Sequence, residues 1–397
     1  MRSTCGFLVK GNEASKDPAA RRSARPTTKA QGRSDANSCG QEMRASSRVA
    51  WRAKILKKVP STTKHWLRRP ILPMKTTVLL SLFIASFAVV AAAPAASPGR
   101  RLLPGQVSRL TTIFADGTDA RVVYETTAVI EAPNWSPDGK WLVYNSGGAM
   151  WRIAADGSGL PEMIYTGSVL AANNDHLLSP DGQTMYLSCA GHLYAVPFAG
   201  GEARRVSNDH PAGQRFRYYL HGISPDGRTL AYTGVEATPG AAGERLDLYT
   251  IPAAGGADVR LTDTPAPDDG PEYSSDGKWI YFNSELHAKV PGHAQVYRMR
   301  PDGTGIEQLT HDERVNWFPH VSPDRQWVVY ISFPPNTEKH PANKEVILRR
   351  MRCDGSEPAD VIACFGGQGT VNVNSWAPDS RRFAYVAYPI LAGGAGR

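Results

Sequence analysis

The sequence is poor in cysteine and lacks the short motifs of several enzyme and metal-binding classes. Five of its 397 residues are cysteine, and only Cys189, Cys353 and Cys364 follow residue 73. None stands in a Cys-x-x-Cys pair, which disfavours a zinc site of that type. An odd number of cysteines cannot all pair, so we expect buried thiols, with a Cys353–Cys364 bridge as the alternative. The chain also has no Gly-x-Ser-x-Gly elbow, which disfavours that class of serine hydrolase.

Positive charge is lacking once the first part of the chain is set aside. Residues 1–73 carry 17 Lys and Arg against four acids, a charge of +13, so the formal net charge of +8 leaves −5 for residues 74–397. The high isoelectric point comes from residues 1–73, so it does not indicate that the rest of the chain binds nucleic acid. Residues 1–73 also show no sustained apolar periodicity. We interpret them as a basic disordered leader upstream of a true start at Met74, with a translated basic arm as the alternative.

Long hydrophobic runs are absent except for one, over residues 78–93, within MKTTVLLSLFIASFAVVAAAPAAS. Lys75, this run and the small residues Ala93-Pro94-Ala95 are typical of a secretory signal peptide, which we place at 74–96. The run is too short and too rich in alanine for a membrane span, and an uncleaved anchor is the alternative. We therefore predict a periplasmic or secreted monomer with no stable membrane span after processing.

What the sequence has in abundance is one turn motif. NWSPDGKWLVYN begins at Asn134, and related copies place their Ser (Ala in the last) at positions 136, 179, 224, 274, 322 and 377. The steps of 43, 45, 50, 48 and 55 residues indicate a repeat architecture. Pro, Asp and Gly in this order favour a turn, so we interpret the Asp of each copy as a turn former and not as a catalytic residue. These are Asp138, Asp181, Asp226, Asp276, Asp324 and Asp379.

Alternating apolar runs flank each turn, and a glycine-bearing hairpin and a short fourth strand follow. Four antiparallel strands in about 45 residues form a propeller blade. The last copy supplies only two strands, over 374–388, and the first β stretch, from Arg109, has no turn copy before it. We therefore predict an all-β six-bladed β-propeller over residues 105–390. Its last blade is shared between N- and C-terminal strands, which closes the ring and removes the open edge.

The repeats, with their Asp-Gly hairpins and Leu-Thr endings such as GlnLeuThr at 308, resemble the TolB-type six-bladed, WD-like propeller repeat. The resemblance covers nearly all of the chain after residue 105. It implies the propeller fold and a place among TolB and related secreted proteins. TolB carries an additional N-terminal α/β domain, for which the stretch before the first blade is too short. The repeats also resemble those of oligogalacturonate lyases, propeller enzymes that use a metal.

The candidate site lies just before each turn, where the innermost strand of a blade begins. These positions are Asn134, His176, His221, Glu272, His320 and Asn374. Repeat symmetry is expected to bring the three His and Glu272 towards one axis, as a ligand set for Mn, Zn or Ca. His221 is the candidate base for proton abstraction. Alternatively, these groups contact only water. His176 and His221 lie three residues before their Ser, whereas Glu272 and His320 lie two before theirs, and this difference can turn a side chain to the other face.

The same mouth of the propeller carries the loops that we expect to contact a ligand. The candidate ligand-binding residues are Asn134, Asp175, Tyr219, Asp269, Trp317, Gln368 and Asn374. Long loops from residues 234, 284 and 332 support this, although insertions are also tolerated in loops without a function. We interpret four histidines near such loops as solvated: His192, His287, His293 and His340. GlyGlyGlnGlyThr at 366 lacks the Gly-Lys-Ser/Thr ending of a phosphate loop and leads into a strand, which disfavours that reading.

Two functions from different classes are compatible with these patterns. One is a binding scaffold that presents the mouth to an envelope protein or a glycan. The other is a metal-assisted carbohydrate-active enzyme, a lyase or hydrolase, built on the three His and Glu272. The lack of a complete catalytic motif favours the scaffold, and the fold alone does not choose.

Overall fold

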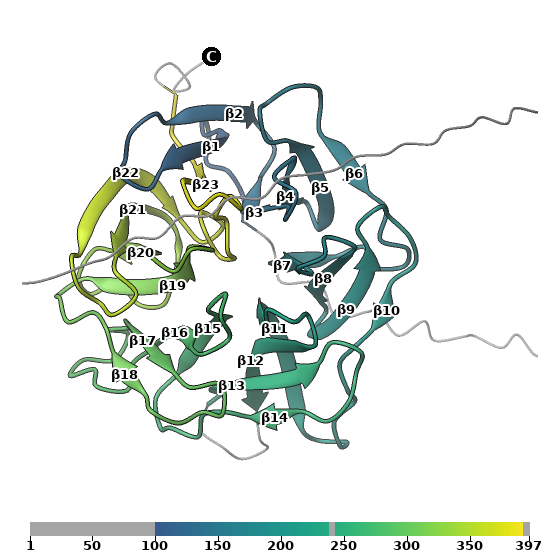
Figure 1. Ribbon diagram of the computed structural model, residues 1–397, viewed down its shortest axis with the longest axis vertical. Helices are drawn as coiled ribbons and strands as arrows, with labels where there is room; N and C mark the ends of the chain where they lie inside the picture. Colours follow the sequence, from purple (N-terminus) through teal and green to yellow (C-terminus); the bar gives the residue numbers. More distant parts are fainter. Residues whose placement is uncertain (1–99, 238–242, 392–397) are drawn as a thin grey trace, which may run out of the picture. The chain divides into compact units, whose positions relative to one another are not determined.

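The computed structural model describes residues 100–237 and 243–391, so the predicted leader (1–73) and signal peptide (74–96) lie outside the described residues. Every regular element in the described part is a β-strand. The strands form six sheets arranged as blades around one axis (Figure 1). This arrangement confirms the predicted all-β six-bladed propeller. In the described ranges no helix has the length and hydropathy needed to cross a membrane.

Blades one to five each contain four antiparallel strands, in chain order from the axis outwards. Blade one comprises β3 (Glu131–Trp135), β4 (Trp141–Ser146), β5 (Ala149–Ala154) and β6 (Glu162–Ile164). Blade two comprises β7 (Ala172–Leu178), β8 (Thr184–Cys189), β9 (His192–Pro197) and β10 (Arg204–Arg205). Blade three comprises β11 (Arg215–Ile223), β12 (Thr229–Ala237), β13 (Arg245–Pro252) and β14 (Val259–Arg260). Blade four comprises β15 (Asp268–Tyr273), β16 (Ile280–Ser284), β17 (Gln295–Met299) and β18 (Glu307–Gln308). Blade five comprises β19 (Val315–Val321), β20 (Val328–Phe333), β21 (Ala342–Met351) and β22 (Ala359–Gly367).

Blade six is built from both ends of the chain. β1 (Ser108–Phe114) pairs on one side with β2 (Arg121–Thr126) and on the other with β23 (Arg382–Ala387). A bridge between Trp376 and Phe383 places the segment before β23 in the innermost position. The predicted sharing of the last blade is therefore confirmed, and the pairing of β1 with β23 closes the ring.

The Ser-Pro-Asp-Gly motifs form the same hydrogen-bonded turn in blade after blade. In the first copy, the Ser136 hydroxyl donates to Asp138 (Oγ–Oδ1 2.7 Å) and accepts the Trp141 NH (2.9 Å). Equivalent Ser–Asp bonds of 2.5 to 2.8 Å recur in blades two to five. The glycine of the motif has a positive φ, as at Gly139 (74°), which is the reason for its presence. The structural interpretation of the motif carboxylates is confirmed.

The hydrophobic core lies between the blades. One buried cluster joins Ile113 and Phe383 of blade six to Val329 of blade five, and another joins Leu177 of blade two to Leu230 of blade three. Because each blade covers its neighbour's apolar face, stability is shared around the ring. The cysteines at 189, 353 and 364 are all free, as expected, with the first buried and the other two partly buried.

Each complete inner strand changes register shortly before the predicted site residues. The irregularities fall between residues 131 and 134, 172 and 176, 220 and 222, 269 and 272, and 317 and 320. In three of them a residue adopts a left-handed backbone: Ala132 (φ 54°), Gly270 (φ 68°) and Phe318 (φ 52°). An irregularity of this kind re-aims the neighbouring side chains, so it decides which face each candidate residue occupies.

Candidate functional site

Polar side chains on the inner strands and the adjoining loops form two groups. The predicted positions lie in the second half of their strands, as at His221 in β11 and His320 in β19, and not where the strands begin. We call the first the mouth cluster, which comprises Asp175, His221, Asp269, His340 and Gln368. We call the second the wall network, which comprises Asn134, Glu272, His320 and Asn374. The division follows the strand register. His221 is the extra residue of a bulge, whereas Glu272 and His320 have cross-strand partners two residues before their Ser.

The wall network joins blades through a buried His–Glu pair. His320 Nδ1 lies 2.6 Å from Glu272 Oε2, and its Nε2 lies 2.9 Å from the Val371 carbonyl oxygen. The amide of Asn374 donates to Glu272 Oε1 (2.6 Å), and the amide of Asn134 donates to the Asn374 carbonyl oxygen (2.5 Å). Both ring nitrogens of His320 thus face oxygen atoms. The network holds the inner strands of blades four, five, six and one together.

In the mouth cluster, His221 lies near two carboxylates. Its Nε2 is 3.4 Å from Asp269 Oδ1 and its Nδ1 is 3.4 Å from the Asn372 carbonyl oxygen. Burial lowers the pKa of His221, but Asp269 and Asp175 together raise it more, so the net pKa is raised. Asp269 also accepts the Thr233 hydroxyl (2.7 Å). Burial raises the pKa of Asp269, yet the hydrogen bond and charge of His221 outweigh it and bring the pKa to about 2.

The pKa of Asp175 is shifted in the opposite direction to that of Asp269. This residue is 4% exposed, and burial raises its pKa to about 6, with the Asp269 charge adding to the effect and His221 opposing it. The half-buried Tyr219 lies on the same strand as His221, and burial raises the pKa of its hydroxyl. Two carboxylates with pKa values pushed apart around an imidazole are typical of ligand-binding and proton-transfer sites.

His340 completes the mouth cluster, and its interpretation as a solvated residue is wrong. The loop between β20 and β21 places its ring against Trp317 (centroids 4.5 Å apart) and Phe318 (5.0 Å). Its Nδ1 lies 2.5 Å from Gln368 Oε1, and its Nε2 lies 3.9 Å from Asp269 Oδ2. The side chain is only 27% exposed, and burial lowers its pKa. The only sequence signal for this position was the length of the loop, which is sufficient to fold back over the mouth.

Phe318, on the aromatic side of the mouth cluster, has a strained backbone conformation. Phe318 adopts a φ of 52°, which is costly for a bulky residue, and its NH donates to Asn283 Oδ1 (3.2 Å). This conformation stacks the Phe318 ring on His221, with centroids 5.8 Å apart. The ring therefore screens the imidazole from solvent on one side.

The remaining predicted site residues have different surroundings. Trp317 is buried beside His340, and its indole NH has no hydrogen-bond partner among the described residues. His176 is fully buried, and burial lowers its pKa to about 4 against the opposing effect of the Val143 and Asn174 backbone groups. His176 is therefore neutral at pH 7, and it makes no hydrogen bond to a residue of the mouth cluster or of the wall network.

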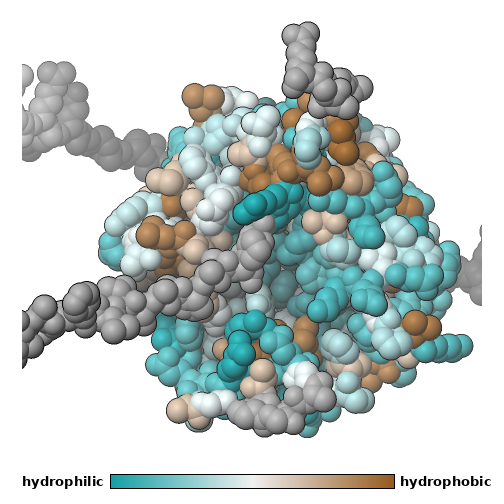
Figure 2. Space-filling view, turned by 180° about the vertical axis from the view of Figure 1, so that it is seen from behind, coloured by the Kyte–Doolittle hydropathy of each residue, from teal (hydrophilic) through white to brown (hydrophobic). Residues whose placement is uncertain are grey.

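No three or more His, Cys, Asp or Glu side chains form a metal-ligand set within residues 100–237 and 243–391. The divalent metal predicted at His176, His221, Glu272 and His320 stays a prediction. Figure 2 shows one face of the molecule, which is hollowed at its centre and mostly hydrophilic around the hollow.

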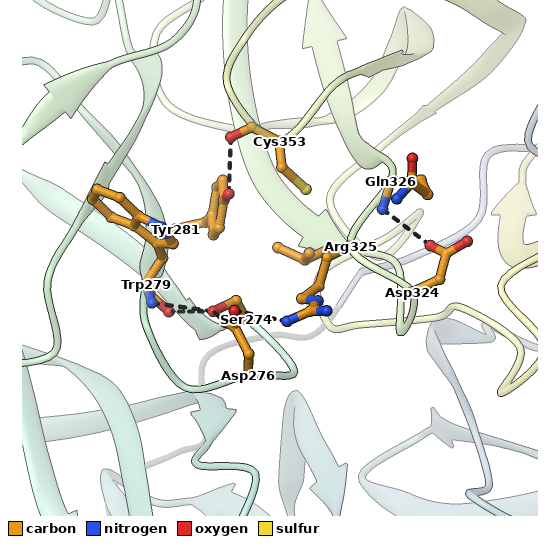
Figure 3. A pocket seen from close by; sticks show the side chains of 9 residues that line it. Ser274, Asp276, Trp279, Tyr281, Asp324, Arg325, Gln326 and Cys353 are labelled. Atoms are coloured by element: carbon orange, nitrogen blue, oxygen red, sulfur yellow. Dashed lines mark hydrogen bonds and ion pairs between the residues drawn. The ribbon is translucent and has the colours of Figure 1, made fainter. Parts of the chain in front are cut away.

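A separate pocket of about 280 Å³ lies between blades four and five, at the turn end of the inner strands (Figure 3). Its polar lining serves the fold. Ser274 donates to Asp276 (2.8 Å) within the turn, and Arg325 pairs with the same carboxylate (2.8 Å). The Tyr281 hydroxyl donates to the Cys353 carbonyl oxygen (2.8 Å). The mouth cluster, in contrast, holds charged groups that no turn requires.

Comparisons with known proteins agree with this architecture. A family model described as the TolB beta propeller domain matches residues 222–352. An uncharacterized protein of Agrobacterium fabrum is 38% identical over 273 residues, which cover 68% of this chain and 88% of that protein. The solved structure of a proposed TolB protein of Agrobacterium tumefaciens is 36% identical with a TM-score of 0.66, and the match covers 72% of this chain and 99% of the other. Oligogalacturonate lyase in complex with manganese is 14% identical with a TM-score of 0.45, covering 66% and 74% of the two chains, and carries no argument about chemistry.

Proposed function

Because the chain belongs to the TolB-like β-propeller family, as its repeats predicted, we propose that it is an exported scaffold whose mouth binds a protein or glycan ligand. The observation that carries the proposal is the mouth cluster. Asp175 is nearly buried without a cation bonded to it, and such a carboxylate reduces stability, whereas the equally buried Asp269 is paired with His221. Unfavourable buried charges and strained residues such as Phe318 are typical of binding sites, where function keeps features that reduce stability.

The composition of the mouth suits a ligand with both polar and apolar surface. Asp269 and His340 offer charge and hydrogen bonds, while Phe318 and the half-buried Tyr219 offer ring faces. Aromatic rings with a polar edge are the usual anchors of protein interfaces and also stack on sugar rings. The signal peptide proposed at 74–96 would deliver this mouth to the periplasm or the medium, where an envelope protein or glycan is the accessible partner.

The test measures retention of an envelope ligand by the purified chain and its variants. We expect Asp269→Asn and Tyr219→Ala to reduce retention of the same ligand at least tenfold, because both change the mouth. Asp302→Asn, an exposed change in a hairpin at the turn end, is the matched control and should retain it fully. A glycan array with the same three variants distinguishes a glycan from a protein. Equal retention by the mouth variants and the control would exclude the mouth as the binding surface.

A metal-assisted lyase or hydrolase is a second proposal, supported by His176. Its neutral imidazole is the form that binds a metal. The bond between Glu272 and His320 would have to open to supply further ligands. Metal analysis of the purified protein, repeated after His221→Ala and His320→Ala, tests this. Loss of a bound metal in both variants would support it, and a metal-free parent protein would remove it.

A further inference from the structure

We propose that the mouth at blade six contains a recognition site for an arginine side chain, and that the chain's own Arg100 fills this site. A partner segment that carries an arginine would then have to displace Arg100 to enter. The second statement rests on the proposed function, because it takes the external ligand to be a protein. The site itself follows from contacts within the chain.

Arg100 is held by three groups from the C-terminal part of the chain. Its guanidinium carbon lies 3.2 Å from the centroid of the Tyr388 ring. One terminal nitrogen donates to the Gln368 carbonyl oxygen, and the other donates to Asn343 Oδ1 (2.9 Å). The Glu131 carboxylate adds an attractive charge nearby. A flat cation over an aromatic face, with hydrogen bonds at its edge, is the way proteins recognise guanidinium groups, and it distinguishes arginine from lysine.

The walls of this site are fixed by contacts that do not involve Arg100. Tyr388 is fully buried, and its hydroxyl donates to the Ile130 carbonyl oxygen (2.6 Å). Gly369 packs so closely behind the ring that a Cβ there would lie 2.5 Å from the Tyr388 hydroxyl oxygen and 2.8 Å from Glu131 Cγ. The backbone NH of Ala132 donates to the Gly369 carbonyl oxygen (2.7 Å). The site is therefore preformed, and it should remain in place when the arginine leaves.

The fit of Arg100 is incomplete. Its Nε is buried without a hydrogen-bond partner among the described residues, and burial lowers the pKa of the guanidinium despite the nearby Glu131. A buried donor that makes no bond weakens the binding of the group that carries it. A partner arginine that satisfies this donor would bind more tightly than Arg100 does.

The arginine site is continuous with the mouth cluster. The carbonyl of Gln368 binds Arg100, while the side chain of the same residue contacts His340 and accepts the Asn372 amide (3.0 Å). The Asn372 carbonyl oxygen in turn lies 3.4 Å from His221 Nδ1. A segment that binds at the arginine site therefore reaches the mouth cluster through the loop around Gln368.

The experiment empties the site and refills it from solution. Arg100→Ala removes the side chain, and Arg101→Ala, at the exposed neighbour, is the matched control. We expect ethylguanidinium to bind Arg100→Ala saturably by calorimetry and at least tenfold more tightly than it binds the parent or Arg101→Ala. Ethylammonium, with the same charge but no planar fork, should show no such preference. If Arg100→Ala does not fold, Arg100→Lys serves, since lysine leaves the two acceptors only partly satisfied.

Equal binding of ethylguanidinium to Arg100→Ala and Arg101→Ala would overturn the proposal, and so would equal binding of ethylammonium. The peptide Pro-Gly-Arg-Arg-Leu, residues 98–102 of this chain, is the second probe. It should bind Arg100→Ala at least tenfold more tightly than the parent, and replacement of its first arginine by lysine should abolish the difference. Saturable binding of both probes without any retained envelope ligand would uphold the arginine site and remove the scaffold function. The reverse result would remove the arginine site alone.

Discussion

Replacement of Asp175 by asparagine is expected to stabilise the protein at neutral pH. Asparagine has nearly the same shape, and its side-chain oxygen can keep the bond from the Asn173 amide (2.6 Å). What changes is the charge, which burial makes unfavourable in the folded state. The substitution therefore isolates the free energy that the folded protein loses by keeping this carboxylate ionised.

The magnitude follows from the pKa of Asp175, which rises from 3.8 to about 6 on folding. Between these values the folded state holds the proton more tightly than the unfolded state does, so stability falls as pH rises through this window. The shift of about 2 units at 1.36 kcal/mol each gives a loss of about 3 kcal/mol, complete above pH ~6. Asp175→Asn should therefore gain about 3 kcal/mol at pH 8 and almost nothing at pH 4.

Urea unfolding of the parent and the variant at five pH values between 4 and 8 measures this difference. Asp269→Asn is the matched control, and its expected effect on stability has the opposite sign. The pKa of Asp269 is lowered from 3.8 to about 2, so its charge contributes stability that is present above pH ~4 and is lost as pH falls towards 2. Its replacement should lower stability by about 2 kcal/mol across the whole range. A pH-independent difference for Asp175→Asn, or a loss at pH 8, would refute the assigned environment of the mouth cluster.

Three further changes test other parts of the structure. His320→Ala leaves Glu272 buried without its partner, so urea unfolding should show a loss of about 3–5 kcal/mol, partly recovered when Glu272→Gln is added. Gly369→Ala forces a Cβ against Tyr388 from a φ of 90°, and thermal unfolding should show a loss of about 1–3 kcal/mol. Arg325→Gly relieves a φ of 60° but removes the ion pair with Asp276, so thermal unfolding should show a change of less than about 1 kcal/mol, and a loss above about 2 kcal/mol would contradict the role given to glycine in the turn.

The fold could be predicted from the sequence because its signals are local. The bonds from Ser136 to Asp138 and from Trp141 to Ser136 span at most five residues, so the residue types at those positions encode the turn directly. Six copies at similar spacing then define the blades. The shared blade followed from counting strands at the two ends, since a closed ring leaves no unpaired edge.

The site could be predicted only in part. Asp175, His221 and Asp269 lie on inner strands, but not all at the beginning, because β11 starts at Arg215, six residues before His221. The division between His221 and the pair Glu272 and His320 matches their different spacing to the Ser, but the groups that each side chain contacts depend on register shifts that arise from pairing with a neighbouring strand. The positions of His340 and Arg100 depend on how a loop and the N-terminal segment fold over the mouth, and such long-range contacts have no local code.

The closure of blade six by both ends of the chain has a consequence for biosynthesis. β1 and β2 leave the ribosome first, yet β1 has no inner neighbour until Arg382–Ala387 have followed. The seam of the propeller can therefore form only after β23 has been made. Termination before Arg382 would therefore leave β1 without its inner neighbour and the ring unsealed.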